Sequence, residues 1–452
     1  MQSFNFSLAC FLVAWTHYHT SGHAQETPVK EIAAARTTWE YSPELLRPFW
    51  SGDTVVGETI LFLGSESGDA RGSVLFPIQE IVSVRSSAGD VTYQAGVDYR
   101  FVPGTREIVV PTKSKIKTSL PADLRRPANS QQFQLTHRDG DGEILFGAKL
   151  EYHQLQTVVT YKKAETAWPV QMPKFDALAL PLTLRKLRDR ESVSIVLLGD
   201  SISTGCNASG WGEGAPFQPA YQDLLVDHLS KHYGGRVKLT NLSVGGQATP
   251  WGITMIDEVI KHQPDLVILA FGMNDSAGRS AAEYAKNTAA MIEKTRVGAP
   301  QAEFILIASM LGNRDWTRLN HDVFPAYRDA LATLASQTGV VLADMTSVWQ
   351  EMLKRKKDAD LTGNGVNHPN DFGHRVYAQV LASLLVETQH APAPKSESRI
   401  SLSSCQFSSM PTKSDPKIPA RIDTAVRRRN SILGSDVSWS TSVSWATNEG
   451  ND

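Results

Sequence analysis

The second half of this 452-residue chain repeats one pattern, a short apolar segment followed by an amphipathic segment of helical length. Five apolar segments typical of buried strands lie within residues 193–345: VSIVLLGD, VKLTNLSV, DLVILAFG, EFILIASM and VVLADM. Between them, residues 221–229, 281–295 and 326–338 carry apolar residues at helical spacing. Strands that alternate with helices favour a parallel sheet covered on both faces. We therefore predict an α/β domain over residues 180–390.

The first part of the chain, residues 30–170, shows a different pattern. Short segments rich in Val, Ile, Thr and Tyr alternate with turns that contain Gly or Asp, as in antiparallel sheet. The segments are TVVGETILFL, EIVSVRSS, VTYQAG, EIVVPT and QTVVTY. Their spacing predicts a small all-β sandwich or jelly roll, which we interpret as an accessory domain. A proline-bearing stretch at residues 166–173 is the predicted linker to the α/β domain.

Neither end of the chain has the pattern of a folded domain. Residues 1–24 contain an apolar run followed by Gly22-His23-Ala24, which predicts a signal peptide and a secreted or periplasmic protein. The run is too short for a permanent membrane anchor, and no other apolar run approaches that length, so we expect no stable membrane insertion. Residues 391–452 are rich in Ser, Thr, Pro and Lys without a sustained period, which indicates a disordered tail.

Charge and cysteine content narrow the range of partners. The 45 basic and 47 acidic residues leave a formal net charge of -2, and no basic stretch is long enough for a nucleic-acid groove. We expect a neutral partner and no nucleic acid. No CxxC or HExxH spacing occurs, so we predict no metal and no cofactor. Cys10 lies in the predicted signal peptide, and we expect no disulfide between Cys206 and Cys405 because a large core does not need one. Nothing in the sequence indicates an oligomeric state.

Four motifs follow predicted strands, at the sheet edge where ligands bind in this class of fold. The first strand runs into Gly199-Asp200-Ser201, which makes Ser201 a candidate nucleophile. The other motifs are NLSVGG, which ends at Gly246, GMND, which contains Asn274, and NHP, which contains His368. In order and spacing, the four motifs resemble those of the SGNH (GDSL) hydrolases.

This resemblance implies a flavodoxin-like, three-layer α/β/α fold and a role for one residue in each motif. Ser201 is then the nucleophile and His368 the base. Gly246, through its backbone amide, and Asn274, through its side-chain amide, are oxyanion-hole donors. The residue types suit this chemistry, because a serine hydroxyl needs an imidazole to take its proton as it attacks an acyl carbon. The tetrahedral intermediate then carries negative charge on the former carbonyl oxygen, which fixed N–H donors stabilise.

One position departs from the pattern of the family, whose histidine usually follows an aspartate by three residues. Gly365 stands at that position in this sequence. Five alternatives stay open for the group that orients the His368 ring: Asn364, Asn367, Asp358, Asp360 or a backbone carbonyl. Asn207, Asn241 and Asn274 each begin an N-x-S triplet, which we interpret as incidental.

The order of the two predicted domains resembles that of two-domain carbohydrate esterases, in which a β-sandwich precedes the SGNH domain. We therefore predict a serine esterase that hydrolyses a small acyl ester, acetyl above all, on a carbohydrate. Trp211 and Trp251 follow two of the motifs and are either an apolar wall for a sugar ring or core residues. Two alternatives are a lipase or thioesterase for longer acyl chains, and a non-catalytic carbohydrate-binding protein with a degenerate hydrolase domain.

Overall fold

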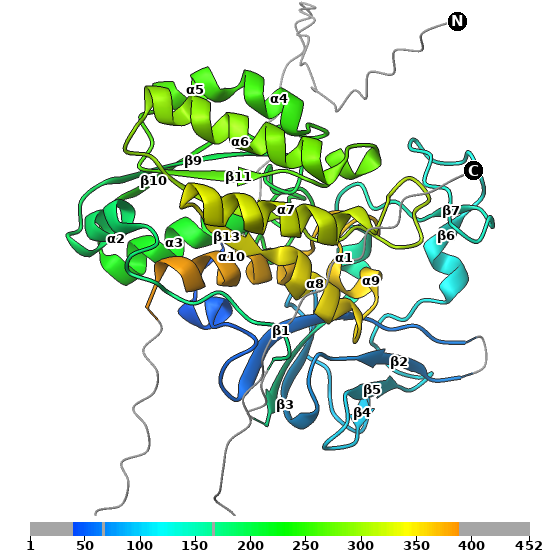
Figure 1. Ribbon diagram of the computed structural model, residues 1–452. Coiled ribbons are helices and arrows are strands. Elements are labelled where there is room, and N and C mark those ends of the chain that lie inside the picture. Colours follow the sequence, from blue (N-terminus) through cyan, green and yellow to red (C-terminus); the bar gives the residue numbers. More distant parts are fainter. Residues whose placement is uncertain (1–38, 66–67, 165–167, 388–452) are drawn as a thin grey trace, which may run out of the picture. The chain divides into compact units, whose positions relative to one another are not determined.

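The computed structural model describes residues 39–65, 68–164 and 168–387 (Figure 1). All of these residues belong to one compact unit. The predicted signal peptide, the Ser-rich tail, Cys10 and Cys405 lie outside the described residues.

A five-stranded parallel sheet with the strand order β10-β9-β11-β12-β13 forms the centre of the α/β part. Its strands are β9 (Val193–Gly199), β10 (Val237–Asn241), β11 (Leu266–Ala270), β12 (Glu303–Ala308) and β13 (Val341–Asp344). The order places the second strand outside the first, as in flavodoxin-like folds. The predicted α/β class and its parallel sheet are therefore confirmed.

Helices cover both faces of this sheet, because alternate side chains of each strand point to opposite sides. Val196 and Leu198 of β9 belong to a cluster with residues of α5, α6 and α7, whereas Ile195 and Leu197 belong to a cluster with α2, α3, α8 and α10. Figure 1 shows α4, α5 and α6 on one side of β9 and β11, with α2, α3 and α10 on the other. The helices of the α/β part are α2 (Pro181–Arg188), α3 (Tyr221–Tyr233), α4 (Thr249–Thr254), α5 (Ile256–Lys261), α6 (Ala281–Gly298), α7 (Val323–Thr338), α8 (Met345–Leu353), α9 (Asp358–Leu361) and α10 (Asp371–Leu385), with a 3-10 turn η3 (Asp275–Ala277).

The first part of the chain contains antiparallel strands, as predicted, arranged in three small sheets. The orders are β1-β8-β3, β2-β5-β4 and β6-β7. Its elements are η1 (Pro43–Leu46), β1 (Thr54–Leu61), β2 (Ala70–Ser73), β3 (Ile78–Ser86), β4 (Arg100–Phe101), β5 (Glu107–Val110), η2 (Pro121–Leu124), β6 (Arg125–Arg126), β7 (Glu143–Ile144), α1 (Glu151–Leu155) and β8 (Gln156–Lys163). The predicted strand VTYQAG forms isolated bridges at Thr92 and Ala95 instead of a ladder. A sandwich or jelly roll, and a domain boundary near residue 170, stay predictions.

Buried polar contacts join the antiparallel strands to the α/β part. Lys356 Nζ lies 2.6 Å from Glu58 Oε1 of β1, and both side chains are fully buried. Thr59 donates a 2.6 Å hydrogen bond to the carbonyl of Asp360 in α9. Hydrophobic residues of β1, β3 and β8 share one core cluster with α3, α8 and α10. The strands therefore rest on the α/β part through specific side-chain contacts.

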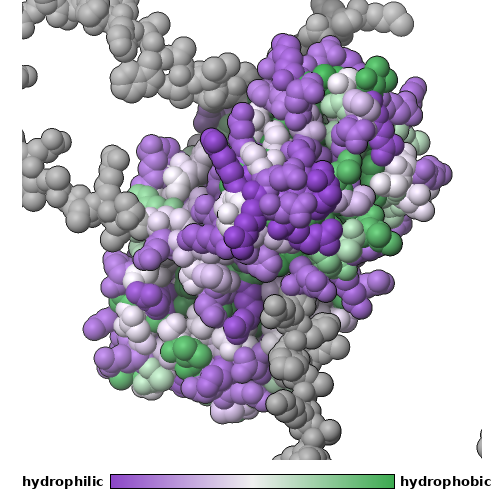
Figure 2. Space-filling model, turned by 90° about the vertical axis from the view of Figure 1, so that its left-hand side faces the viewer, coloured by the Kyte–Doolittle hydropathy of each residue, from purple (hydrophilic) through white to green (hydrophobic). Residues whose placement is uncertain are grey.

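The face shown in Figure 2 is mostly hydrophilic, and its hydrophobic residues form small, separate groups. None of the described helices has the length and apolar character needed to cross a membrane.

Candidate active site

Ser201 lies where the first strand of the parallel sheet ends. Strand β9 stops at Gly199, and the chain turns as Asp200 Oδ1 accepts a 3.0 Å hydrogen bond from the backbone N–H of Ile202. Burial, with a smaller contribution from the charge of Asp275, raises the pKa of Asp200 to about 7. This aspartate shapes the turn that presents Ser201, whose own exposed fraction is 8%.

The Ser201 hydroxyl and the His368 ring are in hydrogen-bond contact. Ser201 Oγ lies 2.9 Å from His368 Nε2. Burial, with a smaller effect of neighbouring His374, lowers the pKa of His368 to about 3. The imidazole is therefore neutral at neutral pH, the state in which it can accept a proton. Two residues that are 167 positions apart in sequence thus make the contact expected of a nucleophile and its base.

The Asn207 side chain is the hydrogen-bond partner of the other ring nitrogen of His368. Its Oδ1 lies 2.8 Å from His368 Nδ1. Its Nδ2 faces three backbone carbonyls, those of Gly147 at 3.2 Å, Lys149 at 3.1 Å and Gly363 at 3.3 Å. Because carbonyls only accept, they require the NH2 group on their side and turn the oxygen toward the ring. An amide oxygen also only accepts, so His368 carries its proton on Nδ1 and leaves Nε2 free to accept from Ser201.

The sequence-based alternatives for this role have other contacts. Asn364 Oδ1 accepts hydrogen bonds from the backbone N–H groups of Val366, Asn367 and His368, at 2.9, 2.9 and 3.1 Å. It shapes the loop that carries the histidine. The Asp360 carboxylate accepts from the backbone of Leu61 and of Lys357. Three other candidates take no part in the contact at Nδ1, which Asn207 occupies: Asn367, Asp358 and a backbone carbonyl.

Gly365 has a conformation that excludes an aspartate at the position expected from the family. Its φ is +76°, a backbone region that favours glycine. A Cβ built on Gly365 would overlap the hydroxyl of Tyr152, which is itself buried and donates a 3.0 Å hydrogen bond to the Leu145 carbonyl. Tyr152 thus fills the space where the carboxylate would lie, and the imidazole takes its partner from Asn207 instead.

Sequence reasoning missed Asn207, whose N-x-S triplet was interpreted as incidental. The residue follows Ser201 by six positions and has a φ of +65°, which asparagine tolerates better than most residues. Its functional contacts come from the Gly147 and Lys149 carbonyls and from the His368 loop, all distant in sequence. A short polar residue close behind the nucleophile was the one available signal, and it does not specify a partner.

The two predicted oxyanion donors lie in the wall of one cavity of about 380 Å³. Gly246 follows β10, and its φ of +76° suits a residue without a Cβ. Asn274 follows β11, and its Nδ2 donates a 2.9 Å hydrogen bond to the Gln247 carbonyl, which ties the two loops together. An amide NH2 has two protons, so one donor of Asn274 is left for a ligand. The same wall contains Asn367, the neighbour of His368 in the chain.

Aromatic and basic side chains complete this cavity. Trp251, one of the two tryptophans singled out from the sequence, lines it together with Trp316. Trp211 is 42% exposed and does not line this cavity. Arg279 and Arg318 add positive charge to the wall. Trp316 and Arg318 come from the loop between β12 and α7, where the sequence showed no motif.

His374 makes structural contacts with the loop behind Ser201 and with α3. Its Nε2 lies 3.2 Å from the Cys206 carbonyl, and its Nδ1 lies 3.4 Å from the backbone N–H of Tyr221. Burial lowers its pKa to about 4. The ring thereby supports the loop that carries Asn207. Across the described residues, no group of three or more His, Cys, Asp or Glu side chains is arranged to hold a metal ion.

Comparison with known proteins places this site in a class. Residues 197–376 match the GDSL-like Lipase/Acylhydrolase family. An arylesterase from Vibrio mimicus is 33% identical over 85 residues, which cover 19% of this chain and 38% of that protein. The chain therefore spans well under half the length of this curated relative.

Two solved structures are similar to parts of the chain. A two-domain esterase active on acetylated mannans is 19% identical, with a TM-score of 0.40, over 49% of this chain and 56% of that one. An acetylxylan esterase from Geobacillus stearothermophilus is 21% identical, with a TM-score of 0.36, over 42% of this chain and 92% of that one.

The family match confirms the resemblance to the SGNH hydrolases. It covers the end of β9, Ser201, both candidate oxyanion donors and His368. Residues 197–376 are accordingly similar to the GDSL-like Lipase/Acylhydrolase family.

Proposed function

We propose that this protein is a serine esterase that removes a small acyl group, acetyl above all, from a carbohydrate. The observation that carries the proposal is the continuous line of hydrogen bonds from Ser201 Oγ through His368 to Asn207 Oδ1. This line begins at the carboxyl end of β9, and Asn367, the neighbour of His368 in the chain, lines the same cavity as Gly246 and Asn274. A binding protein would have no need of a nucleophile, a neutral base and oxyanion donors together.

The first half of the reaction transfers the acyl group to Ser201. His368 Nε2 takes the hydroxyl proton as Oγ attacks the ester carbon, and the C–O π electrons move to the carbonyl oxygen. The Gly246 and Asn274 N–H groups stabilise this oxyanion, and the Ser201 backbone amide is the third expected donor. When the intermediate collapses, the bond to the sugar oxygen breaks, and His368 gives that oxygen its proton. An acetyl-serine ester and a free sugar hydroxyl result.

The second half returns the enzyme to its starting state. His368 takes a proton from water as the water oxygen attacks the acetyl carbon. The same donors stabilise the second oxyanion, and the proton on His368 passes to Ser201 Oγ as acetate leaves. Proton movement is confined to Ser201, water, the sugar oxygen and one ring nitrogen.

Asn207 acts in this mechanism as a positioning residue. Its oxygen holds the Nδ1–H tautomer in both half-reactions, so that Nε2 always faces Ser201. As a neutral group it adds no charge that would stabilise the imidazolium form. We therefore expect a base with a low pKa, in keeping with the direction that burial imposes on His368.

The cavity walls support a small acyl group and a polar alcohol. Gln247, Asn367 and Arg318 interrupt the apolar surface that a long acyl chain would need, whereas Trp251 and Trp316 offer flat apolar faces beside polar groups. Such a mixture suits a sugar ring better than a fatty chain. The order of an antiparallel part before a hydrolase domain, which resembles that of carbohydrate esterases, agrees with this choice.

The test is hydrolysis of aryl acetate, aryl octanoate and acetylated xylan by the wild type and by Ser201→Ala. We expect the variant to lose about three or more orders of magnitude in kcat. Ser203→Ala is the matched control, because its hydroxyl lies two residues away and contacts Tyr221 at 2.7 Å. It should keep activity within about tenfold of the wild type. Equal activity of wild type and Ser201→Ala would refute the nucleophile, and a preference for octanoate would favour the lipase or thioesterase alternative.

A further inference from the structure

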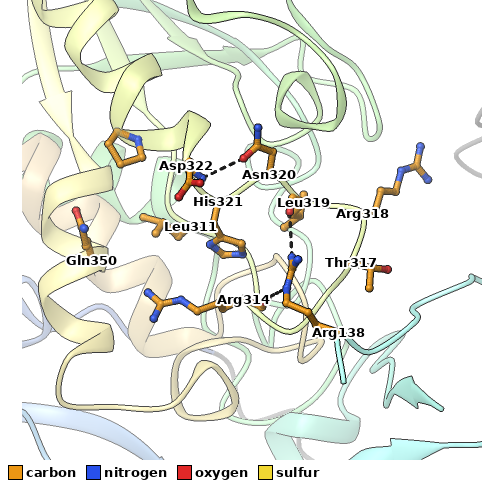
Figure 3. A pocket seen from close by; sticks show the side chains of 11 residues that line it. Arg138, Leu311, Arg314, Thr317, Arg318, Leu319, Asn320, His321, Asp322 and Gln350 are labelled. Carbon is orange, nitrogen blue, oxygen red and sulfur yellow. Dashed lines mark hydrogen bonds between the residues drawn. The ribbon is translucent and has the colours of Figure 1, made fainter. Parts of the chain in front are cut away.

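A second cavity adjoins the one that contains the candidate oxyanion donors. Its volume is about 600 Å³, and its walls come from the loop between β12 and α7, with Arg138 of the antiparallel part (Figure 3). Arg318 and Leu319 line both cavities. A ligand that fills the first cavity and is longer than it could therefore extend along this loop into the second.

The walls of the second cavity are strongly basic although the whole chain has a formal net charge of -2. Arg138, Arg314 and Arg318 line it, with Asp322 as the one carboxylate of the lining. Asp322 occupies the N-cap position of α7, where the positive end of the helix dipole offsets part of its charge. His321 adds no charge at neutral pH, because burial lowers its pKa further below neutrality. Three guanidinium groups thus face one carboxylate.

Among the described residues, Arg314 and Arg318 have no carboxylate oxygen within 4.0 Å of their guanidinium nitrogens. The carboxylate nearest to them in sequence, Asp315, lies 3.3 Å from His137 Nε2 instead. By comparison, Arg279 in the first cavity contacts Asp275 and Glu283. Arg314 also acts on a buried carboxyl, because burial raises the pKa of Asp358 and the charge of Arg314 lowers it by a smaller amount. Neither loop arginine forms an ion pair within the described part of the chain, so both guanidinium groups can contact an external anion.

Arg138 holds this loop in place from the antiparallel part. Its Nε donates to the Arg314 carbonyl at 3.0 Å, and its Nη2 donates to the carbonyls of Trp316 and Leu319 at 3.1 and 3.3 Å. The backbone N–H of Thr317 also donates to the Thr136 carbonyl at 3.1 Å. A loop anchored in this way presents its arginines with little ordering cost when a ligand binds.

Figure 3 shows the side chains of Arg314 and Arg318 extending to opposite sides of the loop. They cannot converge on one small anion in this arrangement. Their spacing suits separate anionic groups along an extended polymer, each held by one guanidinium, which binds carboxylates and sulfates in a bidentate manner.

We propose that Arg314 and Arg318 bind carboxylate or sulfate groups of an acidic polysaccharide whose acyl ester is presented to Ser201. This proposal rests on the proposed function and names its substrate class. It departs from the neutral partner expected from the sequence, because net charge averages over the chain while recognition depends on local charge.

The first experiment measures binding without catalysis. Ser201→Ala protein is titrated calorimetrically with oligogalacturonate, with the same oligomer as its neutral methyl ester, and with a sulfated galactan oligomer. We expect binding of one or both anionic oligomers, at least about tenfold tighter than that of the methyl ester, and a loss of affinity between low and high salt. The stronger of the two anionic ligands identifies carboxylate or sulfate as the natural group. Equal binding of the charged and neutral oligomers would overturn the proposal.

The second experiment assigns the binding to the two arginines. In the Ser201→Ala background, Arg314→Gln and Arg318→Gln should each weaken oligomer binding about five- to thirtyfold, with partial recovery in Arg318→Lys. Arg185→Gln on α2, whose side chain is 52% exposed and distant in the fold from this loop, is the control and should bind like the parent. Unchanged affinity in the double Arg314→Gln, Arg318→Gln variant would contradict the assignment.

Activity on aryl acetate separates this proposal from the esterase function. With Ser201 intact, Arg314→Gln should hydrolyse aryl acetate at the wild-type rate, since Arg314 lines the second cavity but not the first, and this small neutral ester does not reach the second cavity. It should show a raised KM on an acetylated acidic polysaccharide and an unchanged KM on acetylated xylan. If the wild-type protein did not hydrolyse aryl acetate, the esterase function would be refuted, while the binding results would stay valid.

Discussion

His368 donates a hydrogen bond from Nδ1 to Oδ1 of Asn207, at 2.8 Å, where the SGNH pattern supplies an aspartate from the histidine's own loop. In the proposed site, the third member is thus neutral and comes from the loop that follows Ser201. Its orientation depends on carbonyls of Gly147 and Lys149, which lie before the α/β part in sequence. The antiparallel region is therefore connected directly to the chemistry of the site.

Replacement of Asn207 by aspartate should impair this protein, although it would create the residue type of the family. The new carboxylate oxygen would face the carbonyls of Gly147, Lys149 and Gly363, where a donor now lies. We expect a loss of about 2–4 kcal/mol in the free energy of unfolding, measured by urea denaturation. Asn207→Ala should lower kcat about 10- to 1000-fold while leaving the KM for aryl acetate nearly unchanged. A stable and more active Asn207→Asp would contradict this account of the amide.

The pH dependence of kcat/KM should lack an inflection at the ordinary histidine pKa. Burial lowers the pKa of His368 to about 3, so the base stays neutral and active well below pH 6.5. Because the folded pKa lies below the unfolded value, the stability tied to neutral His368 is complete above about pH 6.5 and is lost as pH falls toward the folded pKa. We expect a flat kcat/KM profile from about pH 5 to 8, with an acid limb that follows unfolding. The check is to measure the rate and the circular dichroism at each pH. An inflection of kcat/KM near pH 6.5 without a change in circular dichroism would disprove this expectation.

Gly365→Asp should fail to restore an aspartate-containing triad. The positive φ of this residue disfavours any side chain, and a Cβ would overlap the Tyr152 hydroxyl. We expect a loss of more than about 2 kcal/mol in stability and a drop in kcat, since the same loop carries His368. Gly339→Ala at the end of α7 is the matched control: it has a φ of +67° and open space around its Cβ, so its cost should come from the backbone alone. Equal destabilisation by the two substitutions would show that Tyr152 does not matter.

The buried ion pair between Glu58 and Lys356 should be critical for stability. Both side chains are fully buried at a separation of 2.6 Å, and Tyr161 donates a 2.8 Å hydrogen bond to the same carboxylate. Lys356→Met would leave an uncompensated carboxylate and should cost about 3–5 kcal/mol in the free energy of unfolding. In the double variant Glu58→Gln, Lys356→Met, most of this loss should be recovered. A double variant as unstable as Lys356→Met would show that shape, and not charge, governs the site.

A fragment of residues 168–390 should lack esterase activity even if it is soluble. It retains Ser201, His368 and Asn207 but lacks the carbonyls of Gly147 and Lys149, which orient the Asn207 amide. It also loses Tyr152 and the strand that pairs Glu58 with Lys356. The expected readout is a kcat on aryl acetate at least about 100-fold below that of the whole chain. Full activity of the fragment would support two independent domains and contradict the coupling inferred here.

Local patterns in the sequence were enough to predict the parallel sheet and the position of four candidate residues. Each of Ser201, Gly246, Asn274 and His368 follows an apolar strand or lies in the last motif, and parallel strands bring their carboxyl ends to one edge. The prediction of a strand at VTYQAG was wrong. A strand needs a partner along its whole length, and residues 91–96 have bridges at two positions.

The orienting partner of the histidine and the basic cavity depended on contacts between distant segments. Asn207 became the partner because Tyr152 fills the space at Gly365 and because carbonyls of residues 147 and 149 turn the amide oxygen toward the ring. The loop that carries Arg314 and Arg318 is held by hydrogen bonds from Arg138, about 180 residues earlier in the chain. A hydrophobic period is a property of neighbouring residues and can be read along the chain, whereas hydrogen-bond orientation and local charge arise only where separate segments pack together.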